Sequence, residues 1–412
     1  MNSFLQLLLS SFSGVVTEKV VGALAAVASN HLFADLYGVR LFGELQFALS
    51  LVYVVGSIAL IFGAPVIAPI LGKHRRLRHL IFYHTFRLRL ALSFAVMMSF
   101  MAIVVLAMPV SSATALTLIA ALVLTVEPLA LGSLMAYAET KPWVITRAKA
   151  YASGVRVLWL LGAAHASMGA IFASFAWPLE ACVAAVAPFS RYRSMAFSSP
   201  RSKPRDSIIT RTLVSRGLKI WPAIAASVIV LRMDRLLLGV LMSKADLGIY
   251  AAAASLVEQW NSAGTTLALA LAPSMVYVGR NEEQLRSRSV RLAFYLALVG
   301  VFGWVASIFV GQRVFDVIYG PKFEAGVSVM IYATLCAVAT FADAGLSTWL
   351  VAARRYRLIM VKQGVTVASI AAAPFLMPRA FMMYSPATAT AVSVVLFWAV
   401  TFGFSLHHRD RT

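Results

Sequence analysis

Residues 229–261 read IVLRMDRLLLGVLMSKADLGIYAAAASLVEQWN, two long apolar segments that meet at a short polar turn, residues 243–246. The first segment carries Arg232, Asp234 and Arg235 among valine, leucine and methionine. A run of about 20 mostly apolar residues is long enough to cross a bilayer. A charged side chain at the centre of such a span costs about 2.5 to 3.5 kcal/mol on insertion scales. The stretch therefore predicts a transmembrane hairpin whose charges are candidates for a functional role.

The whole chain shares this apolar character. Of its 412 residues, 60% are hydrophobic and 13% are charged, and the mean hydropathy is +0.82. Soluble domains are about half apolar and a quarter charged, so this chain cannot cover a water-facing surface. The composition predicts an all-α polytopic membrane protein with about twelve transmembrane helices.

Apolar windows place these twelve spans along the chain. They cover residues 14–33, 45–71, 90–108, 113–138, 151–166, 169–188, 217–242, 247–277, 292–310, 325–352, 358–377 and 384–406. The longest polar stretch, residues 190–216, is rich in serine, proline and arginine, as flexible linkers are. We therefore predict an N-terminal six-helix bundle (1–189), a cytoplasmic basic linker (190–216) and a C-terminal six-helix bundle (217–412).

Basic residues follow a simple pattern despite the net charge of +20. With the N-terminus inside, the inner loops, among them 73–89 and 354–362, hold 27 of the 36 lysines and arginines, and the outer loops hold five. Cytoplasmic loops of membrane proteins carry such an excess. The pattern predicts that both termini are cytoplasmic and that the basic loops lie on anionic lipids, and it argues against nucleic acid as a partner.

The two halves of the chain resemble each other. Phe42-Gly43 and residues 50–52 match Leu247-Gly248 and residues 255–257 at a constant offset of 205 residues. Two halves of six spans with the same orientation indicate a parallel repeat, and transporters commonly place their substrate path between such halves. Cys182 and Cys336 both lie in apolar segments, and no cysteine or histidine motif with ligand spacing occurs. The sequence thus predicts neither a metal nor a cofactor.

Three stretches are similar to one known family. MDRLLLGVLMSKADLGIYAAAASLVE (233–258), LYGVRLFGELQFALSLV (36–52) and FDVIYGPKFEAGVSVMIYATL (315–335) resemble the polysaccharide-exporting branch of the multidrug/oligosaccharidyl-lipid/polysaccharide flippase superfamily. The resemblance implies two six-helix bundles around a central cavity. It also implies translocation of a lipid-linked oligosaccharide across the bacterial inner membrane by alternating access. The product would feed O-antigen or exopolysaccharide synthesis, with a polymerase and export machinery as partners.

Arg232 and Arg235 are the first candidates for substrate binding. They are three residues apart and share one face of a helix, and no acid lies three or four residues from either. They need an acid from another span or an anionic ligand, and two guanidinium groups suit a diphosphate. The alternative is a buried ion pair, with Asp234 or Glu258 as partner.

Further polar residues within spans complete the predicted site. Gln259 and Asn261, next to Glu258, are predicted to contact sugar. Lys19, in the first span, either lines the inner half of the cavity or snorkels to the headgroups. Arg156, near a cytoplasmic end, is expected to snorkel.

Five acids within spans, Asp343 among them, are candidates for holding a coupling ion, a proton or sodium, or for forming ion pairs. Glu127 and Glu180 lie close to prolines, where a broken helix frees backbone carbonyls. Asp234 and Glu258 belong to the hairpin described above. The sequence leaves both roles open for each acid.

The favoured function is the flipping of a polyprenyl-diphosphate-linked oligosaccharide from the cytoplasmic to the periplasmic leaflet. An ion-coupled multidrug exporter of the same superfamily is the alternative, although such a protein should present acids without cavity arginines. A membrane-embedded polysaccharide polymerase or ligase would need a larger outer loop than residues 311–324. A nucleotide-driven transporter is disfavoured because the sequence contains no GxxxxGK[ST] loop. We therefore expect a transporter and not an enzyme.

Overall fold

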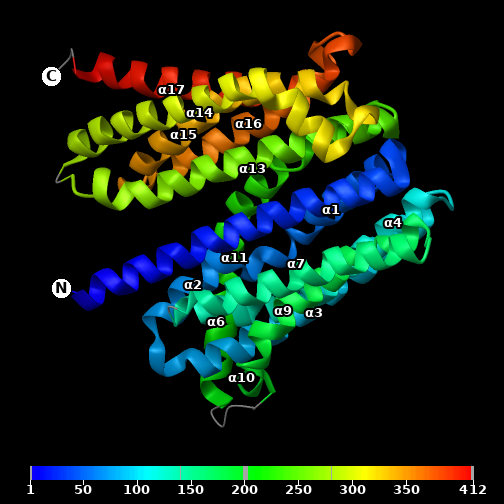
Figure 1. The fold of residues 1–412 in the computed structure, drawn as a ribbon. Helices are drawn as coiled ribbons and strands as arrows, with labels where there is room; N and C mark the ends of the chain where they lie inside the picture. The colour runs from blue at the N-terminus through cyan, green and yellow to red at the C-terminus, as the bar shows by residue number, and fades with distance from the viewer. Residues whose placement is uncertain (1, 140, 198–202, 280, 410–412) are drawn as a thin grey trace. The chain divides into compact units, whose positions relative to one another are not determined.

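The structure is a computed structural model that describes residues 2–139, 141–197, 203–279 and 281–409. These residues form helices and turns without any strand (Figure 1). The chain divides into two compact units, Met1–Val228 and Ile229–Thr412.

The first unit opens with α1 (Asn2–Gly56), which contains the first predicted span and the start of the second. Gly38 separates its two arms with φ 79° and ψ 175°, a conformation that glycine adopts readily because it lacks a Cβ. The second arm continues through η1 (Ala59–Phe62) into α2 (Ala64–Lys73), so the predicted span 45–71 consists of three helical pieces.

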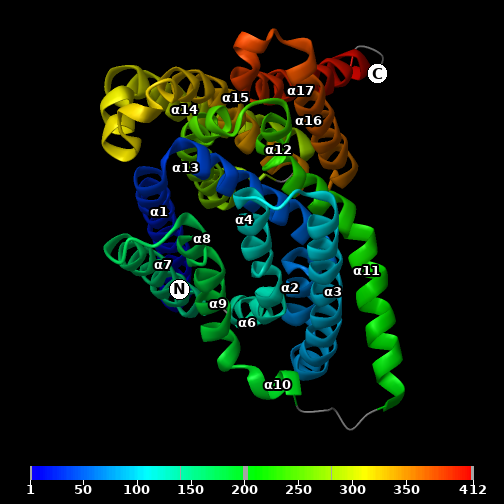
Figure 2. The same cartoon turned by 90° about the vertical axis from the view of Figure 1, so that its right-hand side faces the viewer.

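Some of the remaining spans of the first unit are continuous and others are broken. The break in the fourth span surrounds Glu127-Pro128, because proline lacks the N–H that an unbroken helix needs. Within the unit, α1 packs against α4 and α7, and α9 packs against α6 and α7 (Figure 2). The helices are α3 (Arg78–Ala107), α4 (Ser112–Ala121), α5 (Val123–Val126), η3 (Glu127–Ala130), α6 (Leu131–Ala138), α7 (Pro142–His165), α8 (Ala170–Ala173), α9 (Ala176–Ser190) and α10 (Arg193–Phe197).

The long helix α11 (Lys203–Val230) packs on the first unit. Trp221 Nε1 donates a hydrogen bond to the carbonyl of Ser57 at 2.8 Å. At Gly217, a Cβ atom would lie only 2.6 Å from the carbonyl oxygen of Ile61. Residues 203–216, predicted as part of a flexible linker, are therefore helical, whereas 198–202 lie outside the described residues. The predicted start of the C-terminal bundle at residue 217 falls inside this helix and stays a prediction.

Among the described residues of the second unit, six α-helices follow the break after α11. In this unit α14 packs against α13 and α15, and α16 packs against α17 (Figure 1). Gly345 allows the backbones of α14 and α15 to approach closely, since a Cβ there would lie 2.5 Å from the Cα of Ala293. The helices are α12 (Met233–Leu241), α13 (Lys244–Met275), α14 (Glu282–Tyr319), α15 (Gly326–Ala352), α16 (Tyr356–Leu376) and α17 (Ser385–Arg409), with η4 (Pro321–Phe323) and η5 (Arg379–Tyr384) between them.

The seventh predicted span is broken at the arginines. Helix α11 ends at Val230, residues 231–232 form a turn, and α12 begins at Met233 with Arg232 as its N-cap residue, at φ −134°. The prediction of an unbroken helix through Arg232 and Arg235 is therefore wrong. Such breaks within membrane spans occur where protein or a cavity can satisfy the freed backbone groups.

The predicted number of spans agrees with these helices. By length and composition, nine helices of the described residues could cross a membrane. One of them is the stretch Lys19–Gly56 of α1, which contains two arms, and α7 and α13 are a further 24 and 32 residues long. The expectation of an all-α membrane protein with about twelve spanning helices is confirmed.

Candidate functional site

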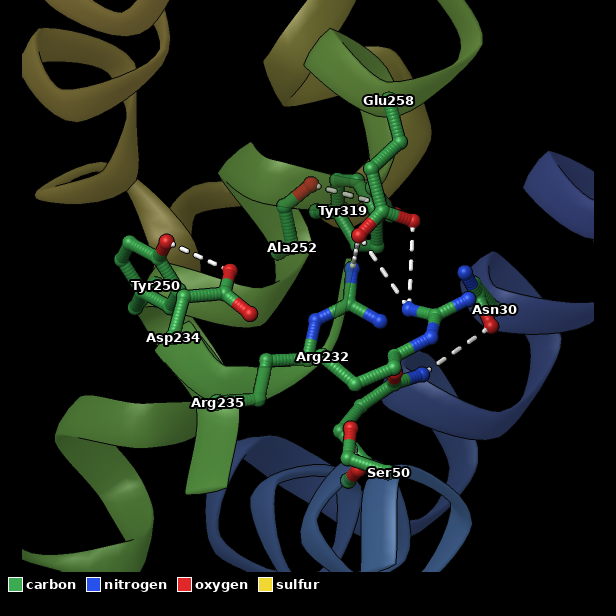
Figure 3. A network of polar contacts seen from close by, with 11 residues as sticks. Asn30, Ser50, Arg232, Asp234, Arg235, Tyr250, Ala252, Glu258 and Tyr319 are labelled. Carbon is green, nitrogen blue, oxygen red and sulfur yellow. Dashed lines mark hydrogen bonds and ion pairs between the residues drawn. The ribbon is translucent and has the colours of Figure 1, made fainter. Parts of the chain in front are cut away.

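The two arginines of the hairpin converge on one carboxylate. Nη1 of Arg232 donates to both oxygens of Glu258, at 3.1 Å and 3.2 Å. Nη2 of Arg235 lies 2.8 Å from Oε1 of the same carboxylate. Glu258 lies in the middle of α13, so the α12–α13 hairpin brings together residues that no single helix face could join (Figure 3). The acid that the arginines lacked locally comes from the next helix.

The three side chains differ in burial. The side chain of Arg235 is 4% exposed, whereas those of Arg232 and Glu258 are 23% and 29% exposed. A buried guanidinium requires a partner, because an uncompensated charge in the interior costs several kcal/mol. Arg235 is therefore the fixed part of the cluster, and Arg232 and Glu258 form its accessible edge.

Asp234 points away from this carboxylate, toward Tyr250 (Figure 3). The hydroxyl of Tyr250 donates to Oδ2 of Asp234 at 2.7 Å. Oδ1 of Asp234 is buried and has no hydrogen-bond partner among the described residues. Of the two acids proposed as direct partners of the arginines, the structure thus assigns Glu258.

A second ion pair lies between α15 and α16 in the same unit. Nζ of Lys362 lies 2.8 Å and 2.7 Å from the two oxygens of Asp343 and donates to Oγ of Ser347 at 2.7 Å. Nε1 of Trp398, on α17, donates to Asp343 at 2.7 Å. Lys362 is 6% exposed, so its assignment to a cytoplasmic loop is wrong. Asp343 lies within a predicted span and has no basic residue three or four positions away. In the sequence, this is the signal that another helix must supply its cation.

The first unit contains two buried ion pairs of its own. Arg156 pairs with Glu180, and its Nε donates to Ser29 at 2.7 Å. Arg156 is 7% exposed, so the expectation that it snorkels to the headgroups is wrong. Arg89, which the sequence placed in an inner loop, is 2% exposed and pairs with Glu127. Both arginines turn inward because a distant helix offers an acid, and a coupling-ion role for Glu127 and Glu180 stays a prediction.

The other predicted site residues lie as follows. Lys19 is exposed on α1 of the first unit. Gln259 and Asn261 are half-buried on α13, and Oδ1 of Asn261 accepts a hydrogen bond from Thr340 on α15 at 2.9 Å. Sequence reasoning did not find Tyr250, which lies three turns before Asn261 on the same helix.

A cavity of about 290 Å³ lies inside the second unit. Helices α12, α13, α15, α16 and α17 contribute to its wall, together with η5. Its charged lining residues are Asp234, Glu258, Asp343 and Lys362. The cavity therefore borders both ion-pair clusters of the unit. Within the described part of the chain, no group of three or more histidine, cysteine or acidic side chains is arranged to hold a metal ion.

Comparisons with known proteins reveal similarity in structure. No protein-family model matches the sequence, and no curated protein matches it. Lipid II flippase MurJ, in its inward closed conformation, superposes with a TM-score of 0.73 at 11% identity over 95% of this chain and 87% of that one. An inward-facing multidrug resistance MATE family transporter of the MOP superfamily gives 0.69 at 12% identity, over 95% and 96% of the two chains.

A third similar structure is a MOP superfamily transporter from Pyrococcus furiosus, whose binding pocket has reverse polarity. Its TM-score is 0.56 at 13% identity, over 98% of this chain and 95% of that one. At these identities the similarity concerns the fold, and it does not single out the polysaccharide-exporting branch. The chain therefore has the all-helical fold of the MOP-superfamily transporters.

Proposed function

We propose that the protein is a flippase that moves a polyprenyl-diphosphate-linked oligosaccharide from the cytoplasmic to the periplasmic leaflet of a bacterial inner membrane by alternating access. The supporting observation is the convergence of Arg232 and Arg235 on Oε1 of Glu258, at 3.1 Å and 2.8 Å. A phosphate oxygen carries the same charge and accepts the same hydrogen bonds as this carboxylate. Glu258 thus occupies the position that a substrate phosphate would take.

In the proposed cycle the diphosphate replaces Glu258 as the partner of both arginines. Arg232 meets the diphosphate first because it is the more exposed of the two. Substrate binding of this kind would leave the carboxylate of Glu258, which is 29% exposed, without its arginine partners. A coupling ion, a proton or sodium, would take their place at that carboxylate.

The other predicted contacts also have roles in the proposed cycle. Asn261 and Gln259 contact the glycan, and Lys19 supplies a further cation along the path. The lipid tail stays in the bilayer, both termini are cytoplasmic, and the delivered product passes to a polysaccharide polymerase and export machinery. The basic loops contact anionic lipids.

The test is flipping of a fluorescent polyprenyl-diphosphate-linked oligosaccharide in proteoliposomes. Replacing both arginines (Arg232→Gln with Arg235→Gln) should lower the flipping rate about 100-fold or more, because each charged hydrogen bond contributes about 1.5–3 kcal/mol. The conservative pair Arg232→Lys with Arg235→Lys should retain part of the rate, since lysine keeps the charge and loses the paired donors. Normal flipping by the double glutamine variant would overturn the proposal.

The matched control is Arg313→Gln, which removes an exposed arginine of α14 far along the chain from the cluster. It should flip substrate at the unaltered rate. The unfolding midpoint of each purified variant separates a lost site from a lost fold.

The second candidate function is an ion-coupled multidrug exporter. The observation that favours it is that three acids, Asp234, Glu258 and Asp343, line the cavity and could meet a cationic drug. Two of them already pair with basic side chains, which weakens the case. Efflux of ethidium by proteoliposomes, retained in the double glutamine variant, would favour the exporter over the flippase.

A further inference from the structure

We infer that the cavity inside the second unit binds a neutral, hydroxyl-rich ring of the size of one monosaccharide. In the proposed function this ring is the sugar attached directly to the diphosphate, and that assignment rests on the flippase proposal. The cavity, its charge balance and its open hydrogen-bonding groups are properties of the second unit alone.

The dimensions of the cavity fit one ring. Its volume of about 290 Å³ lies just below the range for sites that hold drug-sized molecules, about 300 to 1,000 Å³. Glu258 belongs both to its wall and to the arginine cluster. A phosphate held by Arg232 and Arg235 would therefore place the sugar that follows it at this cavity.

The charges around the cavity cancel. Glu258 pairs with two arginines and Asp343 with Lys362, and the remaining acid, Asp234, accepts from Tyr250. The three acids of the wall, Asp234, Glu258 and Asp343, are thus matched in number by Lys362, which also lines the cavity, and by the two arginines that pair with Glu258. A charged ligand would lose its hydration on entering the cavity and would find no counter-charge there. A neutral ligand leaves every ion pair intact.

Three polar groups of the wall still have hydrogen bonds to make. Among the described residues, the Gln363 side chain and the amide nitrogen of Asn261 have no hydrogen-bond partner, and Oδ1 of Asp234 is buried without one. The two amides offer donors and the carboxylate an acceptor, and a sugar hydroxyl can serve both. A buried polar atom is costly to leave unpaired, so a hydroxylated ligand gains by satisfying it.

Two aromatic rings contribute to the apolar part of the wall. Tyr332 and Tyr384 both line the cavity, with their rings nearly perpendicular and their centroids 5.2 Å apart. Ligand pockets combine such apolar surface with a few oriented polar groups. The C–H faces of a pyranose ring and its equatorial hydroxyls match these two kinds of surface.

The test is binding of neutral methyl hexopyranosides (gluco, galacto and manno) to the full-length purified protein, measured by saturation-transfer NMR. At least one should bind, and Cys336→Trp, which fills the cavity from a lining position, should abolish the signal. Gln363→Leu should weaken binding about ten-fold through the loss of one hydrogen bond. Gln312→Leu, on the exposed surface of α14, is the matched control and should bind normally.

Charged probes decide between neutral and ionic occupants. Glucosamine, glucuronate and sodium ions should neither bind in the cavity nor displace the neutral glycoside. Tighter binding of a charged probe, or the absence of binding by all three neutral glycosides, would overturn the inference.

Cys336 also gives an independent measurement. In a Cys182→Ser background it is the single cysteine, and the bound glycoside should slow its reaction with a small methanethiosulfonate several-fold. Arg232→Gln with Arg235→Gln is assayed for flipping only, because it removes two of the three cations that balance the acids of the cavity. If that variant loses flipping and the wild type binds no glycoside, the sugar site is refuted and the flippase proposal stands. If the wild type binds a glycoside and the variant flips normally, the flippase proposal is refuted.

Discussion

At the scale of single residues, a charge within an apolar span indicates that a partner exists but not where it lies. Lys362 shows this best, because the sequence places it at the end of a basic loop and the structure buries it against Asp343, 19 residues earlier. The pair is enclosed by Ser347 and Trp398, which also bind the carboxylate or the ammonium group.

Replacing one member of this pair should destabilise the protein. Lys362→Met leaves the carboxylate of Asp343 uncompensated, and breaking a buried pair in this way costs about 3–5 kcal/mol. The double variant Lys362→Met with Asp343→Leu should regain most of that loss, because an apolar replacement of both partners removes the unpaired charge. Unfolding in detergent measures the effect, and equal losses in the single and double variants would contradict this account.

At the scale of helices, breaks and close contacts determine where side chains can meet. The turn at residues 231–232 makes Arg232 an N-cap residue, so the two arginines approach Glu258 from a helix terminus and from the first turn of α12. The break at Glu127-Pro128 likewise presents Glu127 to Arg89. In the sequence, a proline marks the break at Glu127-Pro128. The turn at residues 231–232 occurs without a proline.

The contact between α14 and α15 should be sensitive to a single methyl group. Gly345→Ala places a Cβ 2.5 Å from the Cα of Ala293, so the helices must separate, and overpacking of this kind costs about 1–3 kcal/mol. Gly364→Ala on α16 is the matched control, since nothing lies within 4 Å of its added Cβ. The unfolding midpoint should fall for the first variant and stay level or rise slightly for the second, because alanine favours the helix. A similar midpoint for both would show that α14 and α15 are not tightly packed there.

At the scale of the whole molecule, the alternation of basic and neutral loops predicts the orientation in the membrane. In a background without Cys182 and Cys336, a cysteine at exposed Ser243 should react with an impermeant thiol reagent in intact cells. A cysteine at exposed Arg76 should react only after the membrane is permeabilised. Labelling of Arg76 from outside, with Ser243 protected, would reverse the proposed topology.

The sequence alone determined that the chain is an all-helical membrane protein of about twelve spans. This follows because apolar segments of this length partition into lipid, where the backbone must satisfy its own hydrogen bonds. It also named the charges of the hairpin, because ionisable groups stand out in such segments.

Only the tertiary structure decided which charges pair. Arg232 and Arg235 meet Glu258, Lys362 meets Asp343, and the inward turn of Arg156 depends on an acid from another helix. A helix determines its own neighbours at three and four residues, whereas contacts between helices depend on packing, at positions such as Gly345 and at breaks such as residues 231–232. The pattern of apolar residues contains the first kind of information and not the second, so the spans could be predicted and the site had to be observed.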